Sequence, residues 1–334
     1  MKAYELQGGF GIDSLQVVER PQPEPGPGQI LLKLRAWSLN FRDLMTVLGT
    51  YNPKLKLPFT PLSDGVGEVT AVGSGVTRVK VGDRVAGIFM QKWLEGEPSE
   101  AKGQSALAGS IPGLLAEYAV LHEDGVVHVP QHLSDDEAAT LPCAAVTAWH
   151  ALVSAGGVKA GDVVLVQGTG GVSLFALQFA KLLGARVIAT SSSDAKLARA
   201  KELGAADGIN YKTTPEWGQR ALELSGKGVD HIVEVGGAGT LTESLRAIRM
   251  GGRISLIGVL SGAGQVNPIP ILMKNVCVQG IYVGSRAMFE AMNRAISLHR
   301  VKPVVDRVFP FEQVREALRH MESGAHFGKI VIRR

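Results

Sequence analysis

Cysteine is scarce in this chain: only Cys143 and Cys277 occur among its 334 residues. Two thiols cannot form the disulfide framework of a small secreted domain, so the sequence favours a reducing compartment. The first residues, MKAYELQGG, lack the apolar core of a signal peptide, and no run of 18 apolar residues could span a membrane. We therefore expect a cytoplasmic protein that does not bind membranes.

Dense charge is missing as well. Lysine and arginine (35) exceed aspartate and glutamate (31) by only four, and no basic run approaches a nucleic-acid-binding patch. The small positive excess suits the attraction of an anionic cofactor. The chain is 45% hydrophobic and has 41 glycines, a composition typical of a globular protein with many tight turns. Its length predicts two domains.

The stretch 163–193, VVLVQGTGGVSLFALQFAKLLGARVIATSSS, is the most regular part of the chain. Residues 163–167 predict a buried strand, residues 172–183 a helix and residues 186–190 a second buried strand. The first strand and the helix are joined by a G-x-G turn, formed by Gly168, Thr169, Gly170, Gly171 and Val172. Backbone amides of such a turn can bind a pyrophosphate, so we expect a dinucleotide site, with a ligand-free turn as the alternative.

The end of the second strand indicates which dinucleotide binds. Sites for NAD place an Asp or Glu about 20 residues after the glycines, where it binds the ribose hydroxyls. No carboxylate occurs between Gly168 and Asp194, and the corresponding position holds Ser191 and Ser192, with Lys196 close behind. Hydroxyls and cations suit a 2′-phosphate, so we predict NADPH rather than NADH. Alternatively, the serines cap a helix that begins near Asp194.

The N-terminal part of the chain has a different pattern. Residues 1–127 read as short strands and turns, with strands at 28–39 and 115–120 and a polar surface loop at 91–112. The stretch 64–87 has alternating valines broken by glycines, which is typical of a small twisted β-barrel. The stretch 133–153 predicts a helix with Ser134 as its N-cap.

Strands and helices alternate beyond the central stretch. The predicted helices lie at 194–203, 215–224 and 240–249, and the predicted strands at 229–235, 253–259 and 276–283. This alternation predicts an α/β fold with a parallel, doubly wound sheet. Two amphipathic helices, at 287–299 and 311–323, and a strand at 329–332 close the chain.

Several segments together resemble the medium-chain dehydrogenase/reductase superfamily over nearly the full length. They are GVGEVTAVGSGVTRVKVGDRV, LPCAAVTAWHAL, VVLVQGTGGVS, KELGA, VDHIVEVGG, GGRISLIGV and HFGKIVI. The resemblance implies a GroES-like β-barrel catalytic domain, at 1–143 and 284–334, and a Rossmann domain at 144–283, with the active site in the cleft between them. It also implies hydride transfer to or from NAD(P).

The resemblance bears on zinc. Zinc alcohol dehydrogenases of this superfamily bind catalytic zinc through Cys, His and Cys, and the corresponding positions in this chain are Asn40, Ser63 and Cys143. One thiol with an amide and a hydroxyl is not a competent zinc set. The four cysteines of the structural zinc lobe are also absent from residues 91–113. We expect no bound metal, and expect Cys143 to be a small apolar residue at a helix start.

Zinc-free relatives mostly reduce activated substrates, namely quinones, α,β-unsaturated carbonyls and enoyl thioesters, because a conjugated carbonyl spreads the charge that follows hydride attack. Asn40 matches a residue beside the nicotinamide in quinone oxidoreductases and is the candidate hydrogen-bond donor. Tyr51 lies where enoyl thioester reductases carry a proton-donating tyrosine and is the candidate acid. Alternatively, Asn40 caps a helix that begins near Phe41, and Tyr51 is an ordinary residue at the rim of the site.

The same resemblance assigns further cofactor contacts by position. Beyond the glycine turn and the strand-end serines, these contacts are Thr147, Tyr211, Gly236, Ile257, Gly258 and Lys329. Thr147 matches a threonine near the nicotinamide ribose or phosphate, and Tyr211 matches a tyrosine that lies by the 2′-phosphate together with Lys196. Lys329 belongs to a late Gly-Lys pair near the cofactor. His150, on an apolar helix, reads as a core histidine rather than a catalytic base.

Three functions remain open on the sequence alone. The first is a zinc-independent, NADPH-dependent reductase of activated C=C bonds or quinones, acting on a small electrophile. The second is an alcohol dehydrogenase or ketone reductase, and the third is a non-catalytic NADPH-binding sensor. We also expect a homodimer, because residues 276–283, VCVQGIYV, form an uncharged apolar edge strand, which in relatives pairs with its twofold mate.

Overall fold

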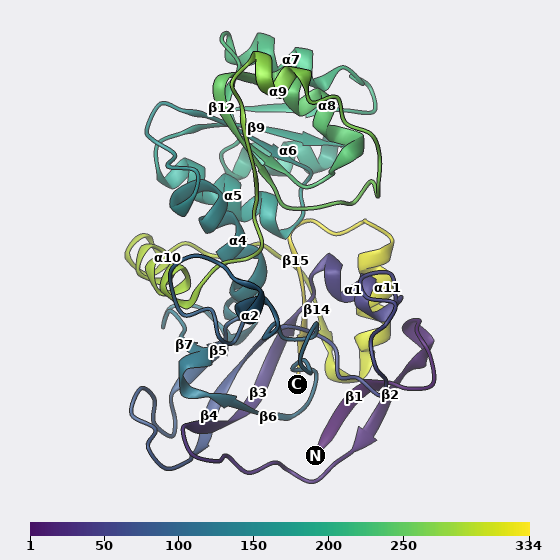
Figure 1. Cartoon of the computed structure of the whole chain (residues 1–334), viewed down its shortest axis with the longest axis vertical. Coiled ribbons are helices and arrows are strands. Elements are labelled where there is room, and N and C mark those ends of the chain that lie inside the picture. Colours follow the sequence, from purple (N-terminus) through teal and green to yellow (C-terminus); the bar gives the residue numbers. More distant parts are fainter. The chain divides into compact units, whose positions relative to one another are not determined.

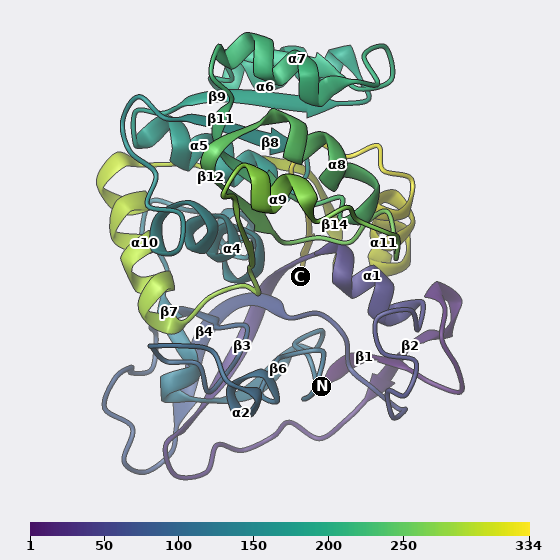
Figure 2. The ribbon, with the colours of Figure 1, turned by 45° about the horizontal axis from the view of Figure 1, so that its top comes forward.

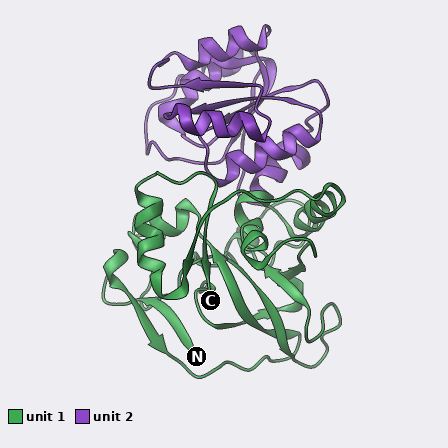
Figure 3. Ribbon diagram, turned by 180° about the vertical axis from the view of Figure 1, so that it is seen from behind, with its two compact units in different colours: residues 1–146, 284–334 green, residues 147–283 purple.

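The computed structural model describes residues 1–334 (Figure 1). The chain forms two compact units, the first made of residues 1–146 and 284–334 and the second of residues 147–283 (Figure 3). The sequence places the first boundary after residue 143, whereas the structure divides the chain after residue 146. The difference arises because helical backbone continues through this point, from Leu141 to Ser154, so no linker marks the boundary.

Six parallel strands form the sheet of the second unit, in the order β10-β9-β8-β11-β12-β13. They are β8 (Val163–Gln167), β9 (Arg186–Ser191), β10 (Asp207–Asn210), β11 (Val229–Glu234), β12 (Ile248–Leu256) and β13 (Cys277–Gly280). The predicted doubly wound parallel sheet is therefore confirmed. The winding direction reverses between β8 and β11, and sheets of this kind bind ligands beyond the carboxyl ends of their strands at such a point.

Six helices belong to this unit, and four of them form two pairs. The six helices are α4 (Val146–Trp149), α5 (Gly171–Leu182), α6 (Asp194–Leu203), α7 (Trp217–Ser225), α8 (Ala238–Ala247) and α9 (Ile269–Met273). The first pair is α5 with α6 and the second is α7 with α8. The small α9 lies beside α8 near β12 (Figure 2). Helix α6 has the predicted bounds because Ser193 caps its start and Gly204 its end.

Several predicted elements of this unit begin or end elsewhere, and the predicted strand 276–283 is shortened to Cys277–Gly280. The predicted helix 240–249 stops at Ala247, and the predicted strand 253–259 starts five residues earlier, at Ile248, and stops at Leu256. Val229 pairs with Ile248 and His231 with Arg253, so the extra residues of β12 form an irregularity in the ladder. Gly251 and Gly252 lie in this irregular segment.

A seven-stranded sheet forms the centre of the first unit, in the order β14-β15-β3-β4-β5-β7, with β6 paired to β3. Its strands are β3 (Gln29–Ser38), β4 (Asp64–Val72), β5 (Arg84–Gly87), β6 (Tyr118–His122), β7 (Val126–His128), β14 (Val305–Pro310) and β15 (Lys329–Arg333). A separate hairpin consists of β1 (Lys2–Leu6) and β2 (Leu15–Glu19). The pairs β3–β4 and β3–β15 are antiparallel, which brings the carboxyl end of β3 beside the start of β4.

Gly67 allows β3 and β4 to approach each other closely. A Cβ atom at this position would lie 2.1 Å from the carbonyl oxygen of Lys33, so the two backbones would have to separate. We predict that Gly67→Ala lowers the free energy of unfolding by about 1–3 kcal/mol, visible by calorimetry as a lower Tm. Gly103→Ala is the control, because a Cβ there meets no atom within 4 Å. An unchanged Tm for Gly67→Ala would contradict this explanation of the strand pair.

The helices of the first unit are α1 (Phe41–Val47), α2 (Glu100–Gly103), α3 (Asp135–Ala138), α10 (Arg286–His299) and α11 (Val314–Glu322). The long helix predicted at 133–153 is instead broken into α3, α4 and two wider helical turns, Leu141–Ala145 and His150–Ser154. Ser134 caps α3 as predicted, and its Oγ accepts a hydrogen bond from the amide of Glu137 at 3.2 Å. No helix of the chain combines the length and the apolar character needed to cross a membrane.

The predicted surface loop at 91–112 is partly buried, which corrects the expectation from its polar composition. Trp93 is buried, and its Nε1 donates to the carbonyl oxygen of Gly96 at 2.8 Å. Residues 105–108 are buried as well. Arg42 donates to the carbonyl oxygens of this segment, which ties the loop to α1.

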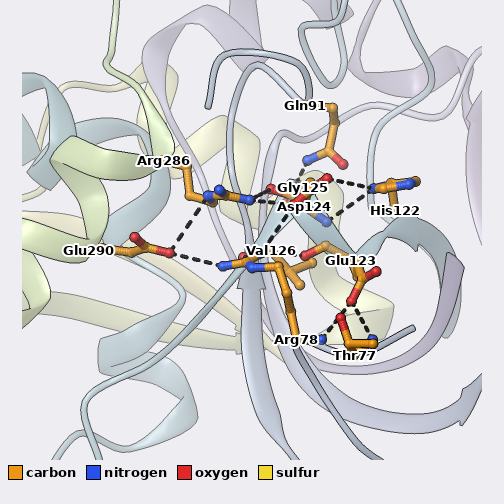
Figure 4. A network of polar contacts seen from close by, with 10 residues as sticks. All are labelled: Thr77, Arg78, Gln91, His122, Glu123, Asp124, Gly125, Val126, Arg286 and Glu290. Atoms are coloured by element: carbon orange, nitrogen blue, oxygen red, sulfur yellow. Dashed lines mark hydrogen bonds and ion pairs between the residues drawn. The ribbon is translucent and has the colours of Figure 1, made fainter. Parts of the chain in front are cut away.

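A polar network fixes the segment that returns to the first unit after residue 283 (Figure 4). Arg286, at the start of α10, donates to Asp124 Oδ1 at 2.7 Å, and this hydrogen bond holds the pKa of Asp124 below its usual range. Arg78 donates to Glu290 Oε1 on α10 at 3.0 Å and to the Glu123 carbonyl oxygen at 2.6 Å. The network therefore joins α10 to the turn between β6 and β7.

Candidate functional site

The glycine turn lies where the sequence predicts it, between the carboxyl end of β8 and the start of α5. Gly168 has a φ of +70°, a conformation that L side chains rarely adopt, and space is open around the Cβ positions of Gly168 and Gly170. Ser173 is buried and its Oγ donates to the carbonyl oxygen of Gln167 at 2.5 Å. Ser173 stands at the third glycine position of the G-x-G-x-x-G pattern of dinucleotide sites and ties the helix to the strand, and the turn keeps room for a phosphate.

A buried carboxylate organises the neighbouring strand end. Glu234, the last residue of β11, is fully buried, and its Oε1 accepts hydrogen bonds from the amides of Gly236 at 2.9 Å and Gly237 at 3.0 Å. Its Oε2 accepts from Nε2 of Gln167, the last residue of β8, at 2.6 Å. Glu234 therefore joins the two strands at the switch point of the sheet and holds the turn that follows β11.

Gln167 and Glu234 are not among the residues predicted from the sequence. The available signal was a long polar residue at the carboxyl end of each of two otherwise apolar strands. The predicted residues Ile257 and Gly258 belong to the same edge, since both of their amides point to the carbonyl oxygen of Glu234, at 2.8 and 3.3 Å.

The end of β9 carries no carboxylate. Ser191 is buried and its Oγ accepts from the amide of Ser193 at 3.3 Å, while Ser193, and not Ser191, is the cap of α6. Tyr211 is exposed beyond β10, and its amide donates to the Ser191 carbonyl oxygen at 3.0 Å. Ser191, Ser192, Lys196 and Tyr211 therefore lie in consecutive segments at one end of this sheet. The acidic residue closest in sequence, Asp194, accepts a hydrogen bond from Nδ2 of Asn210 at 2.9 Å.

Two further predicted residues lie in helical backbone of the second unit. Thr147 is buried in α4. His150 is buried too, and its Nδ1 lies 2.7 Å from the carbonyl oxygen of Val283, which agrees with the interpretation as a core histidine.

In the first unit, Asn40 lies at the carboxyl end of β3 and at the N-cap position of α1. Its backbone amide donates to Asp43 Oδ2 at 2.8 Å, so at this N-cap the Asp43 side chain provides the hydrogen-bond acceptor. Its side chain has a second environment, because Oδ1 accepts a hydrogen bond from Nζ of Lys329 at 2.6 Å. Lys329 also donates to the Leu39 carbonyl oxygen at 2.6 Å.

The other end of the Asn40 amide is unusual. Asn40 is only 9% exposed, yet its Nδ2 has no acceptor in hydrogen-bonding geometry. Leaving a buried donor unsatisfied costs about 1–3 kcal/mol, and folded proteins rarely keep such a group without reason. An acceptor on a bound ligand would satisfy it.

The three positions that hold zinc in metal-using relatives meet around Asp64, at the start of β4. Ser63 Oγ donates to Asp64 Oδ1 at 2.8 Å, and the Cys143 amide donates to Asp64 Oδ2 at 3.2 Å. Asp64 is fully buried and lies across the β3–β4 ladder from Ser38, two residues before Asn40. The sequence positions of the former metal ligands are therefore neighbours in space.

The donor set at this place does not fit zinc. The hydroxyl of Ser63 is turned to Asp64, and the amide oxygen of Asn40 is occupied by the Lys329 side chain. Burial raises the pKa of the Cys143 thiol, and the nearby Asp64 raises it further, which opposes the thiolate that zinc needs. No group of three His, Cys, Asp or Glu side chains in the chain is arranged to hold a metal ion.

The buried charges of this cluster perturb one another. Desolvation raises the pKa of Asp43 to about 6 in spite of the adjacent Arg42 guanidinium. Desolvation also raises the pKa of Asp64, and Lys329 opposes this change. Burial lowers the pKa of Lys329, while the carboxylates of Asp64 and Asp43 favour its charged form. The cluster thus holds opposite charges close together in a water-poor environment.

Tyr51 is connected to this cluster through Arg42. The Arg42 guanidinium lies 4.8 Å from the centroid of the Tyr51 ring and 4.9 Å from that of Phe89, and its Nη1 lies 3.4 Å from Asp43 Oδ1. Tyr51 itself is 37% exposed. The structure therefore places the candidate acid on the solvent side of Arg42, with Asp43 on the buried side.

Comparisons with known proteins match both units. A family model described as an alcohol dehydrogenase GroES-like domain matches residues 26–131, and one described as a zinc-binding dehydrogenase matches residues 171–297. A zinc-type alcohol dehydrogenase-like protein of Schizosaccharomyces pombe is 46% identical over 332 residues, which is 97% of this chain and 96% of that protein.

Solved structures share the fold over the whole chain. An NAD-dependent alcohol dehydrogenase is 36% identical, with a TM-score of 0.91 and full coverage of both chains. A mycobacterial protein in complex with NADPH is 29% identical, with a TM-score of 0.84, and a mycobacterial quinone oxidoreductase is also 29% identical, with a TM-score of 0.82; both matches cover both chains fully.

Proposed function

This chain belongs to the medium-chain dehydrogenase/reductase superfamily of oxidoreductases, and from that premise we propose that it is a zinc-independent, NADPH-dependent reductase of activated C=C bonds or quinones. The observation that carries the proposal is the first-unit cluster. A buried amide donor, Asn40 Nδ2, lies where relatives bind a metal, and the side chains around it are engaged in ways that do not suit zinc. We place the activity in the cytoplasm, as the scarcity of cysteine suggests.

The second unit supports a nicotinamide cofactor. The glycine turn of residues 168–171 and the turn at Gly236 and Gly237 would hold its phosphates and ribose, and Ser191 with Lys196 would face a 2′-phosphate. When bound, reduced nicotinamide supplies a hydride. The solved relatives include one in complex with NADPH and one described as NAD-dependent, so the preference for NADPH rests on the residues at the end of β9.

The residues of the first unit supply the polar chemistry that an activated carbonyl needs. Reduction of an enone or quinone leaves negative charge on a carbonyl oxygen, which a fixed N–H donor stabilises. Asn40 would donate from Nδ2 to that oxygen without itself losing a proton. Tyr51, or water, would then supply the proton.

Alcohol dehydrogenase activity is the second candidate, because the S. pombe relative and the NAD-dependent structure carry that description. The donor set around Asp64 argues against it, because the carbonyl of a plain ketone must be polarised more strongly than one amide donor can achieve. A non-catalytic NADPH-binding role is the third candidate and would give tight cofactor binding without turnover.

The test is a substrate panel. We expect quinones, enones or enoyl thioesters to oxidise NADPH, which is measured by its absorbance. Simple ketones should give little NADPH oxidation, and simple alcohols should give little NADP⁺ reduction in the reverse direction. Efficient oxidation of simple alcohols would favour the second candidate, and binding without turnover on every electrophile would favour the third.

We further propose a homodimer formed by a second copy of the chain at the β13 edge. Next to this edge, large apolar side chains are exposed, namely Met250, Ile269, Leu272 and Met273, with Leu272 at 79%. An open strand beside an apolar surface favours pairing with its own mate.

This dimer is expected to give a light-scattering mass of twice the 35.4 kDa chain at micromolar concentration. Leu272→Glu should lower that mass toward the monomer, because it places a charge in the apolar contact. Leu298→Glu is the control, since Leu298 is equally exposed, at 77%, but lies on α10 in the first unit. A monomeric wild type would refute the dimer.

A further inference from the structure

Lys329 has an unusual position for a lysine. It is 3% exposed, and its Nζ reaches the carboxyl end of β3 from the start of β15. Two hydrogen bonds of 2.6 Å, to the Leu39 carbonyl oxygen and to Asn40 Oδ1, hold it there. Since lysine is rarely buried unless it is paired, these contacts call for an explanation beyond packing.

The contact with Asn40 decides how the amide is turned. A lysine ammonium has three donors and no acceptor, so only the oxygen of the amide can face it. The nitrogen must then point away from Lys329, and this nitrogen is the buried atom without an acceptor. The observed contact with Lys329 therefore fixes the orientation of the amide.

We propose that Lys329 is a positioning residue, which fixes the Asn40 amide so that Nδ2 is presented to the carbonyl oxygen of an activated carbonyl substrate. The proposal rests on the proposed function, and it adds Lys329 as the residue that holds the Asn40 donor in place. Without Lys329 the amide could turn its oxygen toward the developing negative charge, which would repel it, and the N–H donor would no longer be held in place. Preorganised donors stabilise such charge because they need no reorientation during the reaction.

This role differs from the one that the resemblance implies for Lys329. A cofactor contact would make the affinity for NADPH depend on the lysine. A positioning residue for Asn40 acts on turnover and leaves cofactor affinity nearly unchanged. The two roles therefore predict different measurements.

The experiment compares four variants with wild-type protein: Lys329→Met, Lys329→Arg, Asn40→Ala and the double variant Asn40→Ala/Lys329→Met. For each, kcat and KM are measured with an enone or quinone found active for the wild type, and the Kd of NADPH by fluorescence. We expect Lys329→Met to lower kcat by about tenfold or more, as for loss of a preorganised donor, with an NADPH Kd within about twofold of wild type. Lys329→Arg should recover most of the rate, because guanidinium also donates without accepting.

The double variant gives the sharpest result. If Lys329 acts through Asn40, removing both side chains costs no more than removing Asn40 alone, so the double variant should turn over at about the rate of Asn40→Ala. Rate losses that multiply would overturn the proposal, as would a large loss of NADPH affinity in Lys329→Met with kcat intact. Wild-type protein without turnover on any activated carbonyl would instead refute the proposed function.

A second variant covers the case in which Lys329→Met does not fold. Asn40→Asp keeps an oxygen for Lys329 and gives its ammonium a carboxylate partner, so the fold should be retained. It removes the N–H donor, and kcat should fall as far as in Asn40→Ala. A folded Asn40→Asp variant with wild-type kcat would overturn the proposed orientation of the amide.

Discussion

Replacing Asn40 with alanine is expected to lower kcat for enone or quinone reduction at least tenfold, and by about 10²–10³-fold if its amide is the main donor to the carbonyl oxygen. The physical reason is that Nδ2 is buried, lacks an acceptor and is oriented by Lys329. Affinity for NADPH should change little, because the residues expected to bind it, apart from Lys329, lie in the second unit. Steady-state kinetics and a fluorescence titration provide the two measurements.

Asn40 also occupies a helix N-cap, so a control must separate stability from chemistry. Ser134→Ala removes the cap of α3, with an expected cost of about 0.5–2 kcal/mol in stability and no loss of kcat. If Asn40→Ala behaves like Ser134→Ala, with a lower Tm and an intact kcat, then Asn40 is a helix cap only. The oxyanion contact would then have to come from the nicotinamide ribose or a backbone amide.

The second large effect concerns the cofactor. We expect the wild type to bind NADPH at least ten times tighter than NADH, a difference of about 1.4 kcal/mol. Ser191→Asp should reverse this preference, because a carboxylate at the end of β9 repels a 2′-phosphate and can bind ribose hydroxyls. Fluorescence titration of both cofactors with both proteins measures the change.

The matched control is Ser193→Ala. Ser193 caps α6, so its loss should lower stability and leave the cofactor preference unchanged. Equal wild-type affinities for NADPH and NADH would remove the basis of the prediction. A Ser191→Asp variant that still prefers NADPH would mean that Ser191 does not lie at the ribose.

The parts of the fold that could be predicted from sequence are those with local signals. Helix α6 has the predicted bounds since a serine cap and a glycine stop mark its ends. The strand–turn–helix at residues 163–182 is predicted within one residue, because buried β-branched residues, glycines and an apolar helix follow one another directly. The parallel order of the sheet follows from the alternation of strands and helices.

The features that the sequence could not reveal depend on contacts between distant segments. The loop at 91–112 has a polar composition, but Arg42 from α1 binds its carbonyl oxygens and residues 105–108 are buried. Likewise, Lys329 is 289 residues from Asn40, and only the pairing of β15 with β3 brings them together. The role of Glu234 in joining β8 to β11 depends on strand order in the same way.

Turnover by metal-free protein is the decisive measurement for a zinc-independent reductase. Purified protein is treated with EDTA, its zinc content is determined by elemental analysis, and NADPH oxidation is measured with the best enone or quinone from the panel. We predict well under one zinc per chain, before and after treatment, and an unchanged kcat. Stoichiometric zinc in the purified protein, with activity lost on chelation and restored by added zinc, would contradict the roles assigned to Asn40, Ser63 and Cys143.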